Sequence, residues 1–263
     1  MIPDQISFSI SSFTKVGLKE ADIVKLMTRH DEKYICTVAE LPAILKKAAT
    51  LFRILDIDGT RIQNYETTYL DTADHRMYLD HHNGKLNRYK IRFREYLGSH
   101  QFFLEIKKKD NHGDTEKTRI QITPDFTYKH GANRAFILEN SPFDPRLLEP
   151  VLTSSFSRIT LIGAGIGERV TLDLHPSWRH GSLQASLPGV VIIEVKSARG
   201  NSAEGFGHLL REQRVMTRRI SKYCTGTCLL YPEIRQNRFK LKLLHLKKVN
   251  NSSEIIEYDH ASV

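Results

Sequence analysis

Charged and apolar residues alternate in several short segments of this chain. In one of them Lys90, Arg92 and Arg94 occupy every second position, and the apolar residues Ile91 and Phe93 lie between them. Successive side chains of a β-strand point to opposite faces of its sheet. The segment therefore predicts a strand with one basic face and one apolar face.

The same alternation recurs farther along the chain. Its charged positions are Glu105, Lys107, Lys117, Arg119, Arg169, Asp173, Glu194 and Lys196. A single strand of this kind is ordinary, because one face of an antiparallel sheet is commonly solvated. Like charges on one face nevertheless destabilise a sheet, and two of them roughly 4 Å apart cost about 4 kcal/mol near a protein surface. The set favours a face that a multiply charged anion or a metal ion fills.

Hydrophobic periodicity and turn residues predict the other elements. Helices are expected at 18–27, 40–51, 203–216 and 218–230, with short helices between 128 and 152. Strands are expected at 29–36, 65–71, 85–96, 101–108, 116–122, 156–162, 169–174 and 190–197. Strands joined mainly by hairpins, without regular strand–helix alternation, predict an α+β domain with an antiparallel barrel or a strongly curved sheet. If the apolar faces pack outward against helices, the charged faces line the inside.

The net charge narrows the class of partner. Lys and Arg number 39 against 30 Asp and Glu, which gives +9 and an isoelectric point near 9.4. This favours nucleotides, polyphosphate, nucleic acid or an anionic membrane. Aromatic residues are sparse among the basic strands, which argues against stacking on single-stranded bases. We therefore expect no specific nucleic-acid partner.

Cysteine content and hydropathy bear on the compartment. The three cysteines have no zinc-ligand spacing, the first residues do not resemble a signal peptide, and no apolar run approaches a membrane span. We expect a soluble, cytoplasmic protein with one domain over residues 1–232. Residues 233–263 are basic through Lys248 and polar afterwards. They predict a mobile extension, and a peripheral membrane contact through it stays open.

Taken in order, the charged segments resemble the motifs of a known family. They are Arg29-His30-Asp31-Glu32-Lys33-Tyr34, Tyr69-Leu70-Asp71-Thr72, Tyr89-Lys90-Ile91-Arg92-Phe93-Arg94, Phe103-Leu104-Glu105-Ile106-Lys107-Lys108-Lys109, Glu168-Arg169-Val170-Thr171-Leu172-Asp173, Ile193-Glu194-Val195-Lys196 and Ser221-Lys222-Tyr223-Cys224-x-Gly226. Together they resemble the VTC-type polyphosphate polymerase domain of the CYTH-like triphosphate tunnel metalloenzymes. The resemblance runs from about Arg29 to Leu230, and an ordered set of motifs is more specific than any one of them.

The resemblance implies an eight-stranded antiparallel β tunnel with flanking and C-terminal helices. Such a protein would bind ATP and a divalent metal, Mn²⁺ or Mg²⁺, and transfer the γ-phosphate of ATP to a growing polyphosphate chain with release of ADP. Carried over to this sequence, the candidate catalytic residues are Lys222, Arg169 and Arg158. The candidate phosphate-binding residues are Lys33, Arg92, Arg94, Lys107, Lys117, Arg119 and Lys196. Glu194 would hold the metal.

The chemistry of these residues agrees with that implication. Phosphoryl transfer depends on positioning and on neutralising charge on phosphate oxygens. Arginine offers a planar fork for two oxygens, lysine a compact charge, and a hard metal prefers carboxylate oxygen. Glu194 near Lys196 and Glu105 near Lys107 provide this combination, so Glu105 is a second candidate metal ligand. Alternatively, each carboxylate forms a cross-strand salt bridge, and Lys222 is an exposed helical lysine.

One departure from the family and two other functions stay open. Phe156 stands two residues before Arg158, where the family usually has tyrosine, so any role of that hydroxyl is lost here. The first alternative is a tunnel-type triphosphatase that hydrolyses tripolyphosphate or a nucleoside triphosphate. The second is a non-catalytic module that binds polyphosphate or RNA. The Ser221-Lys222-Tyr223 motif and Lys33-Tyr34 in the first strand favour the polymerase.

Overall fold

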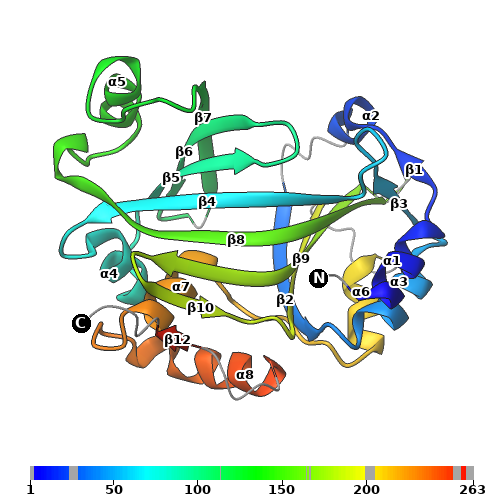
Figure 1. The fold of residues 1–263 in the computed structure, drawn as a ribbon. Coiled ribbons are helices and arrows are strands. Elements are labelled where there is room, and N and C mark those ends of the chain that lie inside the picture. The colour runs from blue at the N-terminus through cyan, green and yellow to red at the C-terminus, as the bar shows by residue number, and fades with distance from the viewer. Residues whose placement is uncertain are drawn as a thin grey trace.

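The computed structural model describes residues 3–23, 29–112, 114–163, 165, 167–198, 205–250 and 256–258. They form an α+β fold around one large, strongly curved and mainly antiparallel sheet (Figure 1). The predicted fold class is therefore confirmed.

Eight strands form the curved body of the sheet, and each pairs antiparallel with its neighbours. In spatial order they are β2 (Arg29–Thr37), β11 (Val190–Ala198), β9 (Glu168–His180), β8 (Leu148–Gly163), β4 (Ile62–Thr72), β5 (Arg88–Tyr96), β6 (Gln101–Lys109) and β7 (Thr115–Ile122). Within the described residues β2 and β7 are the two ends of this order and do not pair with each other. The sheet is thus barrel-like, with one seam that backbone hydrogen bonds do not close.

Shorter strands extend the body at its margins. They are β1 (Lys15–Val16), β3 (Phe52–Leu55), β10 (Leu183–Ser186) and β12 (Ile256–Tyr258). β3 continues along β8, and β10 forms a hairpin with the far end of β9. β8 and β9 pair along most of their length, so they connect the two ends of the molecule (Figure 1).

Helices gather at the two ends of this sheet (Figure 1). They are α1 (Asp4–Ser11), α2 (Leu18–Ile23), α3 (Leu41–Ala48), α4 (Arg76–His82), α5 (Gly131–Asn140), α6 (Phe206–Glu212), α7 (Lys222–Leu230) and α8 (Lys240–Asn250), with 3₁₀ turns η1 (Pro145–Leu147) and η2 (Asn237–Phe239). None of the helices in the described part is both long and apolar enough to cross a membrane.

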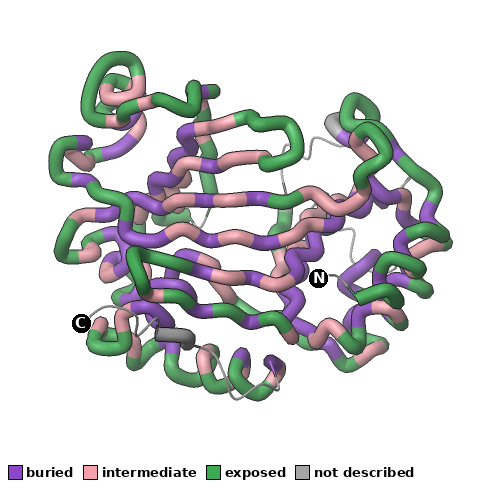
Figure 2. The backbone as a smooth tube through the Cα atoms, viewed as in Figure 1, coloured by how far each residue is buried: buried purple, intermediate pink, exposed green. Residues whose placement is uncertain are grey.

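The largest hydrophobic core lies between α1, α3 and α6 and the outer face of the sheet. It contains Leu45 and Phe206 from the helices and Val170, Leu172 and Leu174 from β9, all buried. Because these β9 residues point outward, the charged residues between them point inward, as the alternation predicts. Both sets of residues are buried in the middle of β9, whereas buried and half-buried positions alternate along the middle of β4 and β8 (Figure 2).

A second core fixes α7 against the sheet. Gly226 of α7 packs on Trp178 of β9, and a Cβ atom at position 226 would lie 2.2 Å from Trp178 Cδ1. Real Cβ contacts are essentially never that short, so this close approach requires glycine. The packing places the first residue of α7, Lys222, over the interior of the sheet.

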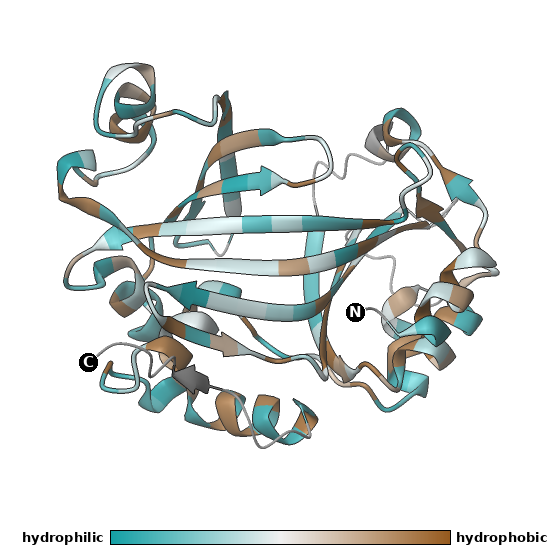
Figure 3. Cartoon of the chain, in the orientation of Figure 1, coloured by the Kyte–Doolittle hydropathy of each residue, from teal (hydrophilic) through white to brown (hydrophobic). Residues whose placement is uncertain are grey.

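The predicted extension at 233–263 is in large part structured. η2 and α8 are helical, with Phe239 and Leu246 buried in the second core. The Gly189 amide donates to Asn250 Oδ1 at 2.9 Å, which ties the end of α8 to the sheet. For residues 237–250 the expectation of a mobile extension is wrong, because apolar residues interleaved with the lysines pack on the domain (Figure 3). Residues 251–255 and 259–263 of that extension lie outside the described residues.

Candidate functional site

The register of β5, β6 and β7 arranges charged side chains in rows. Lys107 lies directly opposite Lys90 on one side and Lys117 on the other. In the adjacent row Glu105 lies opposite Arg92. Like charges directly opposite each other destabilise a sheet. The row of lysines is therefore an arrangement that an anion would stabilise.

Glu105 holds two of these cations in place. Its side chain is fully buried, and Arg92 donates from Nε and Nη2 to Oε2 at 2.8 and 2.6 Å. Lys117 pairs with the other carboxylate oxygen. Burial favours the protonated form, but Arg92, Arg94 and Lys117 together hold the pKa of Glu105 well below its ordinary value. Glu105 was a predicted metal ligand; because its two oxygens are bound to cations, the structure favours a positioning role instead.

Asp173 on β9 joins two predicted catalytic residues. Arg158 of β8 forms a bidentate pair with it, at 2.5 Å from Nε to Oδ1 and 2.8 Å from Nη2 to Oδ2. Lys222 pairs with Oδ2 from the first turn of α7. Burial would raise the pKa of Asp173, but Arg158 and Lys222 lower it to about 2. The alternative of Lys222 as an exposed helical lysine is excluded, since its side chain is 16% exposed and points inward.

Glu194 on β11 is the centre of a third group. Lys33 Nζ lies 2.8 Å from its Oε1, and Lys196 Nζ lies 3.7 Å from its Oε2. Burial opposes ionisation, but Lys196, Lys33 and Lys107 hold the pKa of Glu194 well below its ordinary value. Arg169 shares this face, because it lies directly opposite Lys196 in the β9–β11 register.

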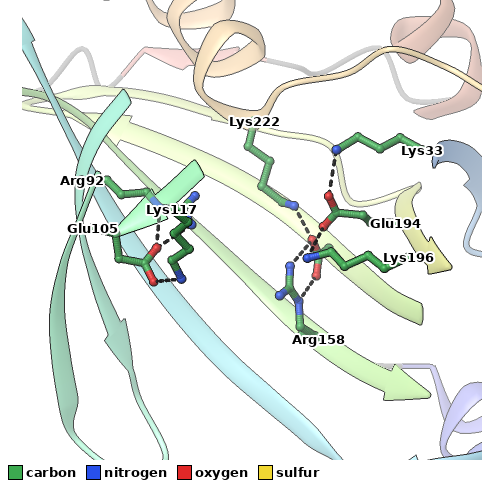
Figure 4. Close-up of polar contacts among 9 residues, drawn as sticks. Lys33, Arg92, Glu105, Lys117, Arg158, Glu194, Lys196 and Lys222 are labelled. Carbon is green, nitrogen blue, oxygen red and sulfur yellow. Dashed lines mark hydrogen bonds and ion pairs between the residues drawn. The ribbon is translucent and has the colours of Figure 1, made fainter. Parts of the chain in front are cut away.

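These groups face one another across the interior of the curved sheet. In Figure 4, Arg92, Glu105 and Lys117 project from one wall, Arg158 and Glu194 project from the other, and Lys222 reaches in from α7. Arg92 lowers the pKa of Lys107 and Glu194 opposes that shift, so Lys107 is within electrostatic reach of both groups. Cations on this face therefore outnumber the carboxylates Glu105, Asp173 and Glu194.

Lys107 is a cation of the interior row whose charge the protein compensates weakly. Within the described part of the chain its side chain makes neither a hydrogen bond nor an ion pair. Arg92 first and burial second lower its pKa well below 10.5, against the opposing effect of Glu194. A bound anion would relieve this strain on the charged form. Lys107 is thus a ready contact for a phosphate group.

Aromatic rings support the cations beside Asp173. Phe156 and Tyr65 stack with ring centroids 5.4 Å apart. Lys222 Nζ lies 4.4 Å from the Phe156 ring centroid, and Arg158 Cζ lies 5.1 Å from it. Such contacts attract cations to the ring face. Phe156 therefore keeps a ring under both cations and lacks only the hydroxyl of the usual family tyrosine.

Not every predicted residue joins these groups. Arg119 is exposed and its guanidinium lies 4.7 Å from the Phe103 ring centroid. Sequence reasoning also missed the role of Asp173 and the candidate residue Lys90. It did not assign Asp173 to Lys222 and Arg158, although the alternation had placed Asp173 on the charged face. It also left Lys90 out of the candidates, and its Nζ donates to Ser221 Oγ at 2.9 Å.

The described residues contain no group of three or more His, Cys, Asp or Glu side chains able to hold a metal ion. Mg²⁺ and similar ions often need only one or two carboxylates, because substrate phosphates supply further oxygens. Glu194 fits that role, since its carboxylate is ionised and faces the interior. Glu105 does not fit it, because its carboxylate is fully buried and pairs closely with Arg92 and Lys117 at its two oxygens. The Glu194 carboxylate is 19% exposed, and Lys196 lies at the longer distance of 3.7 Å from its Oε2.

Comparison with known families agrees with this arrangement. The model of the VTC domain family matches residues 28–231. This chain belongs to the VTC domain family. The matched range holds the eight strands of the sheet body and α7, and it ends before α8. The predicted recognition is confirmed.

Solved structures share the fold at low identity. A putative adenylyl cyclase from Hippeastrum, described as revealing a dominant triphosphatase activity, is 14% identical, with a TM-score of 0.52 over 80% of this chain and 100% of that chain. A putative adenylate cyclase from Bacillus halodurans is 14% identical, with a TM-score of 0.50 over 74% of this chain and 96% of that chain. No curated protein matches this chain. The likenesses support a tunnel-type fold for this VTC domain.

Proposed function

We propose that this VTC domain is a metal-dependent polyphosphate polymerase, which transfers the γ-phosphate of ATP to the end of a polyphosphate chain and releases ADP. The observation that carries the proposal is the lysine row Lys90–Lys107–Lys117. Lys117 of this row faces Lys222 and Arg158 across the interior in Figure 4. Two polyanions must meet in this reaction, and the excess of cations suits that requirement.

The reaction needs little beyond positioning and charge neutralisation. The bond between the β,γ-bridging oxygen and the γ-phosphorus of ATP breaks, and a terminal oxygen of polyphosphate forms a new bond to that phosphorus. The leaving electron pair stays on ADP. Charge on the transferred phosphoryl oxygens is stabilised by preorganised cations. No side chain has to form a covalent intermediate.

Each group then has a role. Arg158 presents a planar fork for phosphate oxygens, and Asp173 fixes its orientation together with that of Lys222. Lys107, Lys117 and Arg92 would hold the rest of the triphosphate or the acceptor chain. Glu194 would hold the divalent ion together with phosphate oxygens. When bound, that ion neutralises charge on the phosphates.

Product analysis tests this proposal. Pure protein incubated with ATP and Mn²⁺ should form ADP and chains of phosphate, separated by size on a gel. Lys222→Ala and Glu194→Ala should abolish chain formation. Lys46→Ala, on the exposed surface of α3, is the matched control and should keep it. Release of inorganic phosphate without chains would refute the polymerase.

The second candidate is a triphosphatase, which the activity described for the Hippeastrum protein favours. Water would replace the polyphosphate terminus as the acceptor, and the same cations would bind the triphosphate. Tripolyphosphate or ATP would then yield phosphate at a rate unaffected by added polyphosphate. Metal-independent polyanion binding with steep salt dependence and no turnover would instead indicate a binding module.

A further inference from the structure

The cationic face of β5 and β6 continues beyond the candidate site to the ends of these strands. Arg88 lies directly opposite Lys109, one step outward from Lys90 and Lys107 on the same face. The step inward is different, because there Arg92 is paired with Glu105. Along β5 and β6, Glu105 therefore offsets the positive charge at the Arg92 step, whereas the steps at Lys90–Lys107 and Arg88–Lys109 pair cation with cation.

Helix α8 begins at the same end. The Phe239 ring, which leads into α8, lies 6.0 Å from the ring of His81 at the end of α4. Lys242 Nζ of α8 lies 5.0 Å from the Phe239 ring centroid. Burial together with Lys90, Arg88, Lys242 and Lys109 lowers the pKa of His81 to about 2, which is consistent with all four cations lying around it.

Three of these cations also affect the pKa of a buried thiol. Burial raises the pKa of Cys224 in α7, and Lys90, Lys242 and Arg88 oppose that rise. Among the described residues no carboxylate forms an ion pair with Arg88, Lys109 or Lys242. These cations come from three separate elements, yet they gather at one end of the sheet. Lone surface lysines would not show this convergence.

We propose that Lys107, Lys90, Lys109, Arg88 and Lys242 form an exit track, which guides a linear phosphate polyanion from the interior past the end of β5 and β6 and over the start of α8. The exit track rests on the proposed function, because it needs a ligand longer than a triphosphate. Its outermost cation lies outside the range that the family match covers, since that range ends at residue 231. That cation, Lys242, therefore adds to the track from outside the matched family domain.

Direct binding measurements without ATP or metal test the exit track. Long-chain sodium polyphosphate reaches all of its cations, whereas tripolyphosphate fills only the interior row. Lys109→Gln and Lys242→Gln should each weaken binding of the long chain about fivefold at low salt, the effect of about 1 kcal/mol per surface cation. The double variant should also lower the salt dependence of log affinity by about two. Tripolyphosphate affinity should change less than twofold.

Lys46→Gln on α3, at the other end of the molecule, is the control with the same change of charge (Figure 1). An equal loss in this control would mean a general charge effect, and an equal loss for both ligands would mean a damaged interior; either result overturns the exit track. Selective loss of long-chain binding supports it. If the wild-type protein shows that selectivity but makes no chains from ATP, the polymerase proposal fails and the exit track stands.

Discussion

Lys222 and Asp173 form a buried ion pair, although 49 positions separate them in the sequence. The pair joins the first turn of α7 to the middle of β9 and completes a network in which Arg158 takes both Asp173 oxygens. In the described part of the chain, neither cation forms an ion pair with a second carboxylate. Asp173 therefore determines where two of the proposed phosphate-binding groups lie.

Replacing Asp173 with Asn should leave two cations buried without a counter-charge. Removing one partner of a buried ion pair typically costs about 3–5 kcal/mol, so the free energy of unfolding in urea should fall by that order. Tripolyphosphate should raise the melting temperature of Asp173→Asn more than that of the wild type, because its oxygens replace the lost carboxylate.

Asp144→Asn is the matched control, since Asp144 makes a similar pair with Arg146 on the surface. It should change stability little, because exposed pairs contribute little. Equal stabilisation of wild type and Asp173→Asn by tripolyphosphate would contradict the assignment of this network to phosphate.

Lys117 should make anion binding depend on pH. Burial lowers its pKa from 10.5 to about 8, even though Glu105 opposes the shift. Only the protonated amine attracts phosphate, so affinity for tripolyphosphate should fall as the pH rises through 8. Without ligand the unfolded chain binds more protons between pH 8 and 10.5, so stability contributed by this group should rise with pH across that window.

Lys117→Arg should remove part of this dependence, because arginine stays charged over the whole range. Calorimetric titration at pH 7, 8 and 9 would measure the affinity of both proteins. If the affinity for tripolyphosphate fell with pH by the same factor in both proteins, Lys117 would not be the group that titrates in the site.

The two interior glutamates should differ in their effect on metal use. Glu194→Gln should raise the Mn²⁺ concentration needed for half-maximal turnover, because its carboxylate is the one that fits a metal. Glu105→Gln should leave that concentration unchanged while lowering stability, since Arg92 and Lys117 lose their buried partner. If both variants needed more Mn²⁺ for half-maximal turnover, Glu105 would be a metal ligand as well.

Gly226→Ala should displace α7. The added Cβ would lie 2.2 Å from Trp178 Cδ1, inside contact distance, and overpacking of this kind typically costs about 1–3 kcal/mol. Turnover should fall with stability, because Lys222 moves with the helix. Gly98→Ala, where a Cβ meets nothing within 4 Å, should affect neither. Thermal unfolding and product analysis would check both variants.

The local pattern determined much of the fold. Alternation placed Lys90, Arg92 and Arg94 on one face, since a strand allows only two faces. It could not give strand register, so it did not show that Lys107 stands between Lys90 and Lys117. Motif resemblance supplied the candidate residues, but it did not reveal that Glu105 is fully occupied by cations.

Composition misled in one place. The lysines of residues 240–248 resemble those of a solvated extension, whereas Leu246 among them packs in the second core. Burial depends on which surface lies next to a helix, and a short segment carries no information about that surface.

For this protein the sequence by itself determined the eight strands of the sheet body, their charged and apolar faces, the excess of positive charge and membership of the VTC domain family. Only the tertiary structure decided which cations share a carboxylate and which element each one projects from. It also decided that, among the described residues, no carboxylate pairs directly with the Lys107 side chain. Periodicity acts between residues a few positions apart. The pairing of Lys222 with Asp173 depends instead on how α7 packs against β9, a contact that close packing around Gly226 and Trp178 creates.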